Sequence, residues 1–346
     1  MDTAIKKGFL KLDDDIVNQS VQKVLQANNK IAAAELLAPA LSGSCALLSF
    51  YDSRSKLLRV ACTGDSRAVL GRRSSSGKWT ATPLSVDQTG SNPDEAARLR
   101  KLHPSEPYVV RNGRVLGNLE PTRAFGDASY KWTREVSEKL RQRFFARSIS
   151  PNLKTPPYVT AEPVITTTKI EPEKGDFVVL ATDGLWEMLT NEEVIGLVGK
   201  WIESQPKTSN PSSPPQSQFD SVWARIFGSR AGDKSGLPVE VPGTTPADAD
   251  GGQKTPFRGV RQWGSGSSDG FVVQDANAAT HLVRNALGGK NHEQVSALLT
   301  LPAPFSRRYR DDLTVQVIFF GNGERTGEVV VNLEGTAGAR EVKAKL

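Results

Sequence analysis

Residues 177–184 read Phe-Val-Val-Leu-Ala-Thr-Asp-Gly, five apolar residues followed by a threonine, an acidic residue and a glycine. A short apolar run bounded by turn-forming residues is typical of a strand that is buried on both faces. Asp-Gly directly after a strand most often forms a turn, and the glycine also lets solvent or a substrate come close to the backbone. The stretch therefore predicts a core strand with Asp183 at its end.

Further short apolar runs precede and follow this strand, and turns rather than long helices separate them. They predict two β-hairpins and one late strand, over residues 45–51 with 57–63, 67–72 with 79–83, and 313–320. Strands that lie this close in sequence pair in an antiparallel manner. We therefore predict an antiparallel α+β fold rather than a doubly wound parallel sheet.

Helical patterns occur before, between and after the predicted strands. Residues 5–37 place apolar side chains at near-helical spacing. Asn92 is followed by a proline, which suits the first position of a helix. Thr190 and Glu193 have the spacing of a capping box, and a further helix is predicted over residues 276–287.

The composition changes sharply in one internal segment. Residues 204–270 are rich in Ser, Pro and Gly and contain too little apolar surface to offset the entropy of ordering them. We predict that they form a disordered insertion. The folded domain would then be discontinuous, with residues 1–203 and 271–325 forming the domain and residues 326–346 a C-terminal tail.

Charge and cysteine content limit the classes of protein to be considered. The formal net charge is +6, and much of the excess lies between Arg98 and Lys154. No nucleic-acid-binding motif accompanies this charge, so we expect no nucleic acid partner; the basic residues are typical of a solvated surface and are also compatible with an anionic substrate. No stretch approaches the roughly 18 apolar residues of a membrane span. Cys45 and Cys62 fall in neighbouring apolar runs, and we expect two reduced core cysteines.

Three acidic residues follow or precede predicted strands, beside small or turn-forming residues. They are Asp65, Asp183 and Asp311. Hard divalent cations such as Mg²⁺ and Mn²⁺ bind several carboxylate oxygens that converge from rigid elements. Each aspartate alone is equally explained by an ordinary turn. The residue pattern alone therefore does not decide between a metal site and a set of ordinary turns.

Five sequence segments, in a fixed order, carry more information than any one aspartate. They are Gly64–Ala68, Leu84–Gln88 with Ser91–Glu95, Pro121–Asp127, Leu180–Glu187 and Arg310–Val315. In this order they resemble the metal-dependent protein phosphatases of type 2C, and outside the insertion the resemblance covers nearly everything from residue 5 to residue 321. Segments such as Asp87-Gln88-Thr89-Gly90 are similar to the mitochondrial branch of that family, close to pyruvate dehydrogenase phosphatase.

The resemblance implies an antiparallel β-sandwich flanked by helices, with a binuclear Mg²⁺ or Mn²⁺ centre that activates water for attack on phosphoserine or phosphothreonine. It implies that Asp183 and Asp311 bind the first catalytic ion and that Asp65, with Asp183, holds a weaker third ion. No side chain is expected to act as a covalent catalyst. Arg123 and Asp127 match a motif that we expect to be structural. The implied partner is a phosphoprotein, with the pyruvate dehydrogenase complex as one candidate, in the mitochondrial matrix or alternatively in the cytoplasm.

One part of the family pattern is missing from this sequence. The family has an Asp-Gly-His-Gly-Gly segment before the first helix, whose aspartate bridges both ions, and no Asp-Gly-His occurs here. We therefore expect a fold that is incomplete at its N-terminus, no activity for the chain as written, and poor solubility. Two hypotheses remain: a piece of an active phosphatase, or a catalytically dead relative that binds a phosphoprotein or regulatory partner.

Overall fold

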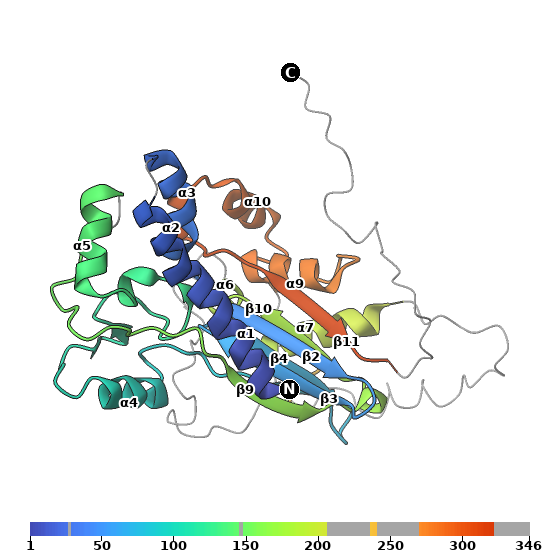
Figure 1. The fold of residues 1–346 in the computed structure, drawn as a ribbon. Helices are drawn as coiled ribbons and strands as arrows, with labels where there is room; N and C mark the ends of the chain where they lie inside the picture. The colour runs from blue at the N-terminus through green and yellow to red at the C-terminus, as the bar shows by residue number, and fades with distance from the viewer. Residues whose placement is uncertain (27–28, 145–147, 206–235, 241–269, 322–346) are drawn as a thin grey trace, which may run out of the picture.

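The computed structural model describes residues 1–26, 29–144, 148–205, 236–240 and 270–321. Within them, two antiparallel sheets pack against each other and helices cover the outside (Figure 1). The predicted α+β sandwich flanked by helices is therefore confirmed. None of the helices in these ranges has the length and apolar character needed to cross a bilayer.

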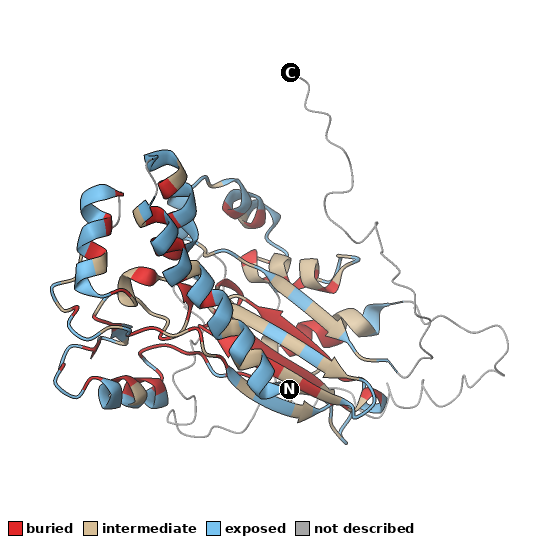
Figure 2. Cartoon of the chain, viewed as in Figure 1, coloured by how far each residue is buried: buried red, intermediate tan, exposed pale blue. Residues whose placement is uncertain are grey.

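The larger sheet has the strand order β11-β10-β4-β5, and every neighbouring pair is antiparallel. Its strands are β4 (Arg67–Arg73), β5 (Trp79–Pro83), β10 (Phe177–Ala181) and β11 (Val315–Phe319). All five residues of β10 are buried, as the apolar run predicts. Figure 2 shows that buried residues are concentrated in the central strands.

The smaller sheet has the order β2-β3-β9 and is also antiparallel. Its strands are β2 (Ala46–Asp52), β3 (Leu57–Thr63) and β9 (Val164–Lys169). Both predicted hairpins, β2 with β3 and β4 with β5, are present. The inner faces of the two sheets share one buried apolar cluster, which includes Leu58, Val60, Ala68, Leu70, Val178 and Leu180. Burial of this shared cluster holds the two sheets together.

Two helices cover the outer face of the larger sheet. They are α7 (Asn191–Ser204) and α9 (Ala278–Leu287), and α10 (His292–Thr300) follows them. The predicted capping box is present, because the side chain of Thr190 accepts from the N–H of Glu193 and the carboxylate of Glu193 accepts from the N–H of Thr190. The apolar side of α7 packs on the sheet in a cluster that contains Val69, Val179, Val194, Leu197 and Leu282.

The N-terminal region is helical, as the pattern of residues 5–37 predicts, and it is divided into several helices. It consists of α1 (Asp2–Asp14), a π-helical turn (Asp15–Gln19), α2 (Ser20–Gln26) and α3 (Lys30–Leu41). A new helix begins at Lys30 because the side chain of Asn29 accepts from the N–H of Ile31. Helix α1 lies over the smaller sheet (Figure 1), where Asp2 pairs with Arg59 of β3 at 2.9 Å.

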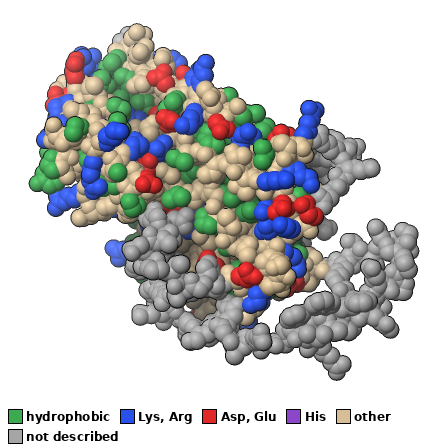
Figure 3. All heavy atoms as spheres, turned by 90° about the horizontal axis from the view of Figure 1, so that it is seen from below, with side chains coloured by type: hydrophobic (Ala, Val, Ile, Leu, Met, Phe, Trp, Pro, Cys, Tyr) green, Lys and Arg blue, Asp and Glu red, His purple; other side chains and the backbone are tan. Residues whose placement is uncertain are grey.

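A lobe of short elements lies beside the sandwich. It contains β1 (Gly43–Ser44), α4 (Pro93–Leu102), β6 (Val110–Arg111), β7 (Arg114–Val115), β8 (Phe125–Gly126) and α5 (Arg134–Arg143). The remaining short helices are α6 (Asp183–Trp186) and the 3₁₀ turns Ala128–Tyr130, Pro172–Lys174 and Phe305–Arg308. Figure 3 shows many Lys and Arg side chains on the left-hand part of the face seen from below, with Asp and Glu side chains among them. On that face the basic residues do not form one continuous patch.

The predicted insertion, residues 204–270, lies mostly outside the described residues, as does the tail from residue 326. Residues 236–240 are an exception, because they pack against the domain. Val239 forms a parallel bridge with Trp79 of β5, and the side chains of Leu237 and Val239 are 3% and 2% exposed. The prediction of disorder is therefore wrong for these five residues, whose two apolar side chains join the main core.

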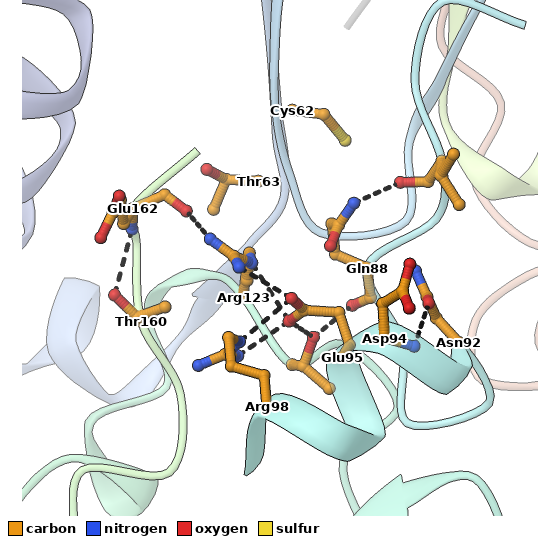
Figure 4. A network of polar contacts seen from close by, with 12 residues as sticks. Cys62, Thr63, Gln88, Asn92, Asp94, Glu95, Arg98, Arg123, Thr160 and Glu162 are labelled. Carbon is orange, nitrogen blue, oxygen red and sulfur yellow. Dashed lines mark hydrogen bonds and ion pairs between the residues drawn. The ribbon is translucent and has the colours of Figure 1, made fainter. Parts of the chain in front are cut away.

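A buried carboxylate connects the lobe to the sandwich (Figure 4). Glu95 in α4 accepts hydrogen bonds from the guanidinium groups of Arg98 and Arg123 and from the hydroxyl of Thr122. Arg123 also donates to the carbonyl of Glu162, just before β9. Burial opposes ionisation of Glu95, but these donors outweigh it and lower its pKa to about 2. As predicted, Arg123 is thus engaged in structural contacts.

We expect Glu95→Gln to lower the free energy of unfolding near pH 7 by roughly 3 kcal/mol, because two arginines lose the charge that they pair with. The pKa of Glu95 is depressed from 4.5 to about 2 in the folded chain. Its contribution is therefore present above pH 4.5 and disappears as the pH falls toward 2. Urea unfolding as a function of pH measures this difference.

The exposed Glu138 on α5 provides the matched control. Glu138→Gln removes the same charge from the surface and should leave both the stability and its pH dependence unchanged. Equal losses for the two variants would show that Glu95 has no special role in joining the lobe to the sheets.

Candidate metal centre

The register of the larger sheet brings three chain segments to one edge. Ala181, the last residue of β10, lies opposite Arg67 of β4 on one side and Val315 of β11 on the other. Because the neighbouring strands are antiparallel to β10, residues after Ala181 lie beside residues that precede Arg67 and Val315. The backbone positions of Asp65, Asp183 and Asp311 therefore meet at the same end of the sheet.

Backbone contacts fix the segment around Asp183 against the segment around Asp311. The N–H of Thr182 donates to the carbonyl of Thr314 at 3.1 Å, and the hydroxyl of Thr182 donates to the carbonyl of Asp312 at 2.8 Å. A Cβ atom at Gly184 would lie 2.6 Å from the carbonyl oxygen of Asp312. The loop that contains Asp312 therefore leaves no space for a side chain at position 184. This close approach explains why a glycine follows Asp183 at the end of the strand.

The carboxylates of Asp65 and Asp183 both lie near the thiol of Cys45. Asp65 is buried and accepts a hydrogen bond from the Cys45 Sγ at 3.2 Å. Burial of Cys45, followed by the negative charges of Asp65 and Asp183, raises the pKa of this thiol well above its ordinary value. Because both carboxylates raise the pKa of the same thiol, they lie near each other.

Asp311 is held differently. Its carboxylate accepts from the N–H of Asp312 at 2.7 Å and lies 3.8 Å from the guanidinium of Arg307. Among the residues that the structure describes, no three or more His, Cys, Asp or Glu side chains are grouped as a metal site requires. The structure thus brings the three predicted segments together, and metal binding by their side chains stays a prediction.

A buried ion pair lies directly behind this edge. Arg67 donates from Nε and Nη2 to the two carboxylate oxygens of Asp87, at 3.0 and 2.7 Å, and both side chains are at most 2% exposed. Its third nitrogen donates to the side chain of Asn191 at the start of α7. The guanidinium also lies 5.2 Å from the ring centroid of Trp186 in α6. Arg67 thereby connects β4, α6, α7 and the loop after β5.

The sequence pattern alone assigns no role to this pair. Arg67 lies in the segment Gly64–Ala68 and Asp87 in the segment Leu84–Gln88, 20 residues apart along the chain. The signal that could have found them is the presence of an arginine in a strand whose other residues are apolar or small, since a buried arginine requires a carboxylate partner.

Two of the three histidines and both cysteines are buried or partly buried, whereas His292 at the start of α10 is exposed. His103 and His281 are 6% and 0% exposed, and His281 Nε2 lies 3.1 Å from the carbonyl of Leu197. Cys62 is buried, which raises the pKa of its thiol to about 12, and Cys45 is partly buried. Thiols with raised pKa values are poor nucleophiles.

Comparison with known proteins gives consistent matches. Residues 2–213 match the family described as Protein phosphatase 2C. A protein phosphatase 2C homolog of Schizosaccharomyces pombe is 45% identical over 92% of this chain and 62% of its own length. The mitochondrial pyruvate dehydrogenase (acetyl-transferring)-phosphatase 1 is 44% identical in Saccharomyces cerevisiae and 33% identical in Homo sapiens, over 97% and 92% of this chain.

The structure is a β-sandwich with acidic residues at one end of the larger sheet, and more than half of the chain matches one phosphatase family. Together these observations define a phosphatase-type domain. The chain belongs to the protein phosphatase 2C family. It spans 62%, 57% and 55% of the lengths of the three relatives named above.

We expect Arg67→Met to lower the free energy of unfolding by about 3–5 kcal/mol, because Asp87 would remain buried without its cation. The double variant Arg67→Met with Asp87→Leu removes both charges and should recover most of that loss. Denaturant unfolding of the two variants and of Asp87→Leu completes the thermodynamic cycle. A double variant no more stable than the single ones would contradict a charge-pair origin of the effect.

Gly184→Ala should destabilise the chain by roughly 1–3 kcal/mol, because the added Cβ meets the Asp312 carbonyl and must displace the loop of residues 311–312. Gly8→Ala is the control, since Gly8 lies in α1 with nothing within 4 Å of an added Cβ. There the substitution should raise helix stability by about 0.5–1 kcal/mol. Thermal unfolding of both variants tests whether the two substitutions change stability in opposite directions. A loss of stability of the same size at both sites would contradict the close-contact explanation.

Proposed function

We propose that this chain is part of a protein serine/threonine phosphatase that uses Mg²⁺ or Mn²⁺ to hydrolyse phosphoserine and phosphothreonine monoesters. The observation that carries the proposal is the meeting of Asp65, Asp183 and Asp311 at one edge of the larger sheet, in a chain of the protein phosphatase 2C family. Asp183 and Asp311 are proposed to bind the first catalytic ion, with Asp65 and Asp183 holding a weaker one.

The donor chemistry of this edge fits hard divalent cations. All three side chains supply carboxylate oxygens, which Mg²⁺ and Mn²⁺ prefer over nitrogen and sulfur. Two of the carboxylates already act on the same thiol, so their charges are concentrated in a small volume. When bound, such ions supply Lewis-acid activation of water and of the phosphoryl oxygens.

The remaining residues of the edge hold the carboxylates in position. Thr182 fixes the distance between the Asp183 and Asp311 segments, and Gly184 permits their close approach. Arg67 donates to Asp87 and Asn191 and lies near the ring of Trp186, which keeps β4 aligned with α6 and α7, the two helices that follow β10. The raised pKa values of Cys45 and Cys62 argue against a cysteinyl intermediate, which favours direct attack by water.

A second candidate function rests on a specific observation. The 346 residues contain no Asp-Gly-His sequence, and the described residues hold no group of three ligands set for a metal ion. A domain that retains the fold but binds ions weakly could still bind a phosphoprotein. We therefore keep a catalytically inactive binding or regulatory role as the alternative.

The finer proposal concerns the substrate and the compartment. Relatives at 44% and 33% identity carry the name pyruvate dehydrogenase (acetyl-transferring)-phosphatase 1, mitochondrial. On this support we propose a phosphorylated subunit of the pyruvate dehydrogenase complex as the substrate and the mitochondrial matrix as the location. A panel of phosphopeptides that includes pyruvate dehydrogenase sequences tests this preference separately from activity itself.

Metal binding and hydrolysis are tested as two independent readouts. We expect Mn²⁺ to bind the 346-residue chain, detected by electron paramagnetic resonance, and Asp183→Asn and Asp311→Asn each to weaken binding by about tenfold or more. Asp65→Asn should have a smaller effect, and Asp94→Asn, an exposed carboxylate on α4, should have none. Unchanged binding in Asp183→Asn and Asp311→Asn would remove these residues from the metal site.

Hydrolysis of a phosphothreonine peptide is then measured with Mn²⁺ for this chain and for a longer chain that also contains an Asp-Gly-His-Gly-Gly segment. We expect no turnover from the chain as written and Mn²⁺-dependent turnover from any product that contains an Asp-Gly-His-Gly-Gly segment. Turnover by the 346-residue chain would refute the inactive-protein alternative. Failure of such a longer product to turn over would leave that alternative as the function.

A further inference from the structure

The five described residues 236–240, here called the strap, cover the free edge of the larger sheet. The N–H of Trp79 donates to the carbonyl of Pro238, and the N–H of Glu240 donates to the carbonyl of Trp79, both at 2.8 Å. Leu237 and Val239 insert between β5 and α7, where the Cβ of Leu237 would lie 2.8 Å from a Cβ at Gly196. The strap is therefore paired along its backbone and buried by its side chains.

One carboxylate fastens the end of the strap to the β4–β5 turn. The hydroxyls of Ser74 and Ser76 both donate to Oε1 of Glu240, at 2.5 and 2.6 Å. The two hydroxyl oxygens also lie 2.8 Å from each other. Hydrogen bonds from these serines lower the pKa of Glu240, so this end of the strap carries a negative charge at neutral pH.

The turn is accessible and is flanked by one basic residue on each side. Ser75 and Ser76 are exposed, and so are Arg73 before them and Lys78 after them. Basic residues beside a serine are a charge pattern that protein kinases use to select their substrates. Ser75 shares this exposure and charge, but among the described residues it makes no hydrogen bond to Glu240. The turn thus offers two adjacent serines that differ in one contact.

A phosphoryl group on Ser76 would replace the hydroxyl donor by a group with a charge of about −1.5 to −2 that can only accept at neutral pH. It would face the carboxylate of Glu240, which has lost one of its donors. Lys78 lies in the same turn and already lowers the pKa of Glu240, so it would be drawn to the phosphate instead. Repulsion between two anions then acts directly on the last residue of the strap.

We propose that Ser76 is a phosphorylation site that controls attachment of the strap to the sheet edge. A protein kinase transfers the γ-phosphoryl group of a nucleoside triphosphate to Ser76 Oγ, the hydroxyl proton passes to the kinase's base, and the nucleoside diphosphate leaves. The modified turn releases Glu240, and Leu237 and Val239 leave the groove beside Trp79. The edge of β5 and its apolar groove then become accessible. This inference does not depend on the phosphatase activity proposed above.

The test uses the full 346-residue chain with phosphoserine incorporated at position 76 or, as the matched control, at position 75. Hydrogen exchange is followed for the amides of Trp79 and Glu240, whose N–H groups make the two strap hydrogen bonds. Phosphoserine at 76 should raise their exchange rates by about tenfold or more, and phosphoserine at 75 should change them by less than about twofold. Equal effects at the two positions, or none at 76, would overturn the proposal.

A variant without the charge of Glu240 distinguishes electrostatic repulsion by the phosphate from steric crowding by it. In a Glu240→Gln chain the strap should remain attached when position 76 is phosphorylated, because Gln carries no negative charge and its amide can donate to the phosphate. Release of the strap in that chain as well would show that the bulk of the phosphate, not its charge, opens the contact.

The modification itself is tested by incubating the unmodified chain with ATP and a protein kinase that selects serines after arginine. Mass spectrometry should locate the added phosphate at Ser76. Phosphate found only at other serines would overturn the assignment of this site.

Discussion

The bidentate pair between Arg67 and Asp87 is the interaction on which the acidic edge of the sheet depends. Both side chains are almost fully buried, and neither charge is tolerable there alone. The pair persists because further groups complete it, namely the side chain of Asn191 and the face of Trp186. A single strand position thus fixes the start of β4, the loop after β5 and the helices that follow β10.

The same arrangement recurs where other layers meet. Glu95 binds Arg98 and Arg123 where the lobe meets the sheets, and Arg72 binds the buried Asp176 at the opposite end of β4 from Arg67. In each case one buried carboxylate takes several donors from different elements. Such networks add little net stability when complete, but they strongly penalise any other arrangement of the same elements. The apolar clusters hold the layers together, and the buried carboxylates determine how they are aligned.

How far the sequence predicts this structure depends on whether a feature is local. The apolar run 177–181 predicts β10, and the Thr190 capping box predicts α7, because each signal lies within a few residues. The residue pattern does not predict strand β9, because its residues are exposed or only partly buried and include three threonines. The residue pattern does not predict the strap, because Leu237 and Val239 are buried only by residues far away in the sequence, among them Trp79 of β5 and Gly196 of α7. Asp87 likewise resembles any loop acid until Arg67 is placed beside it.

For the aspartates at the strand ends, the position of the backbone and the orientation of the side chain have different causes. The hydrophobic pattern predicts the strands, but the meeting of the three segments at one edge depends on strand order, which follows from the family resemblance and not from the pattern. The orientation of each carboxylate depends on nearby charge, and Asp311 lies near Arg307 while Asp65 accepts from Cys45. Burial, and after it the charges of Asp65 and Asp183, raises the pKa of the Cys45 thiol, so both carboxylates act on the same position at this edge. The divalent cation proposed for this edge would offset the charge of more than one aspartate, because it can bind several carboxylate oxygens at once, whereas Arg307 lies near Asp311.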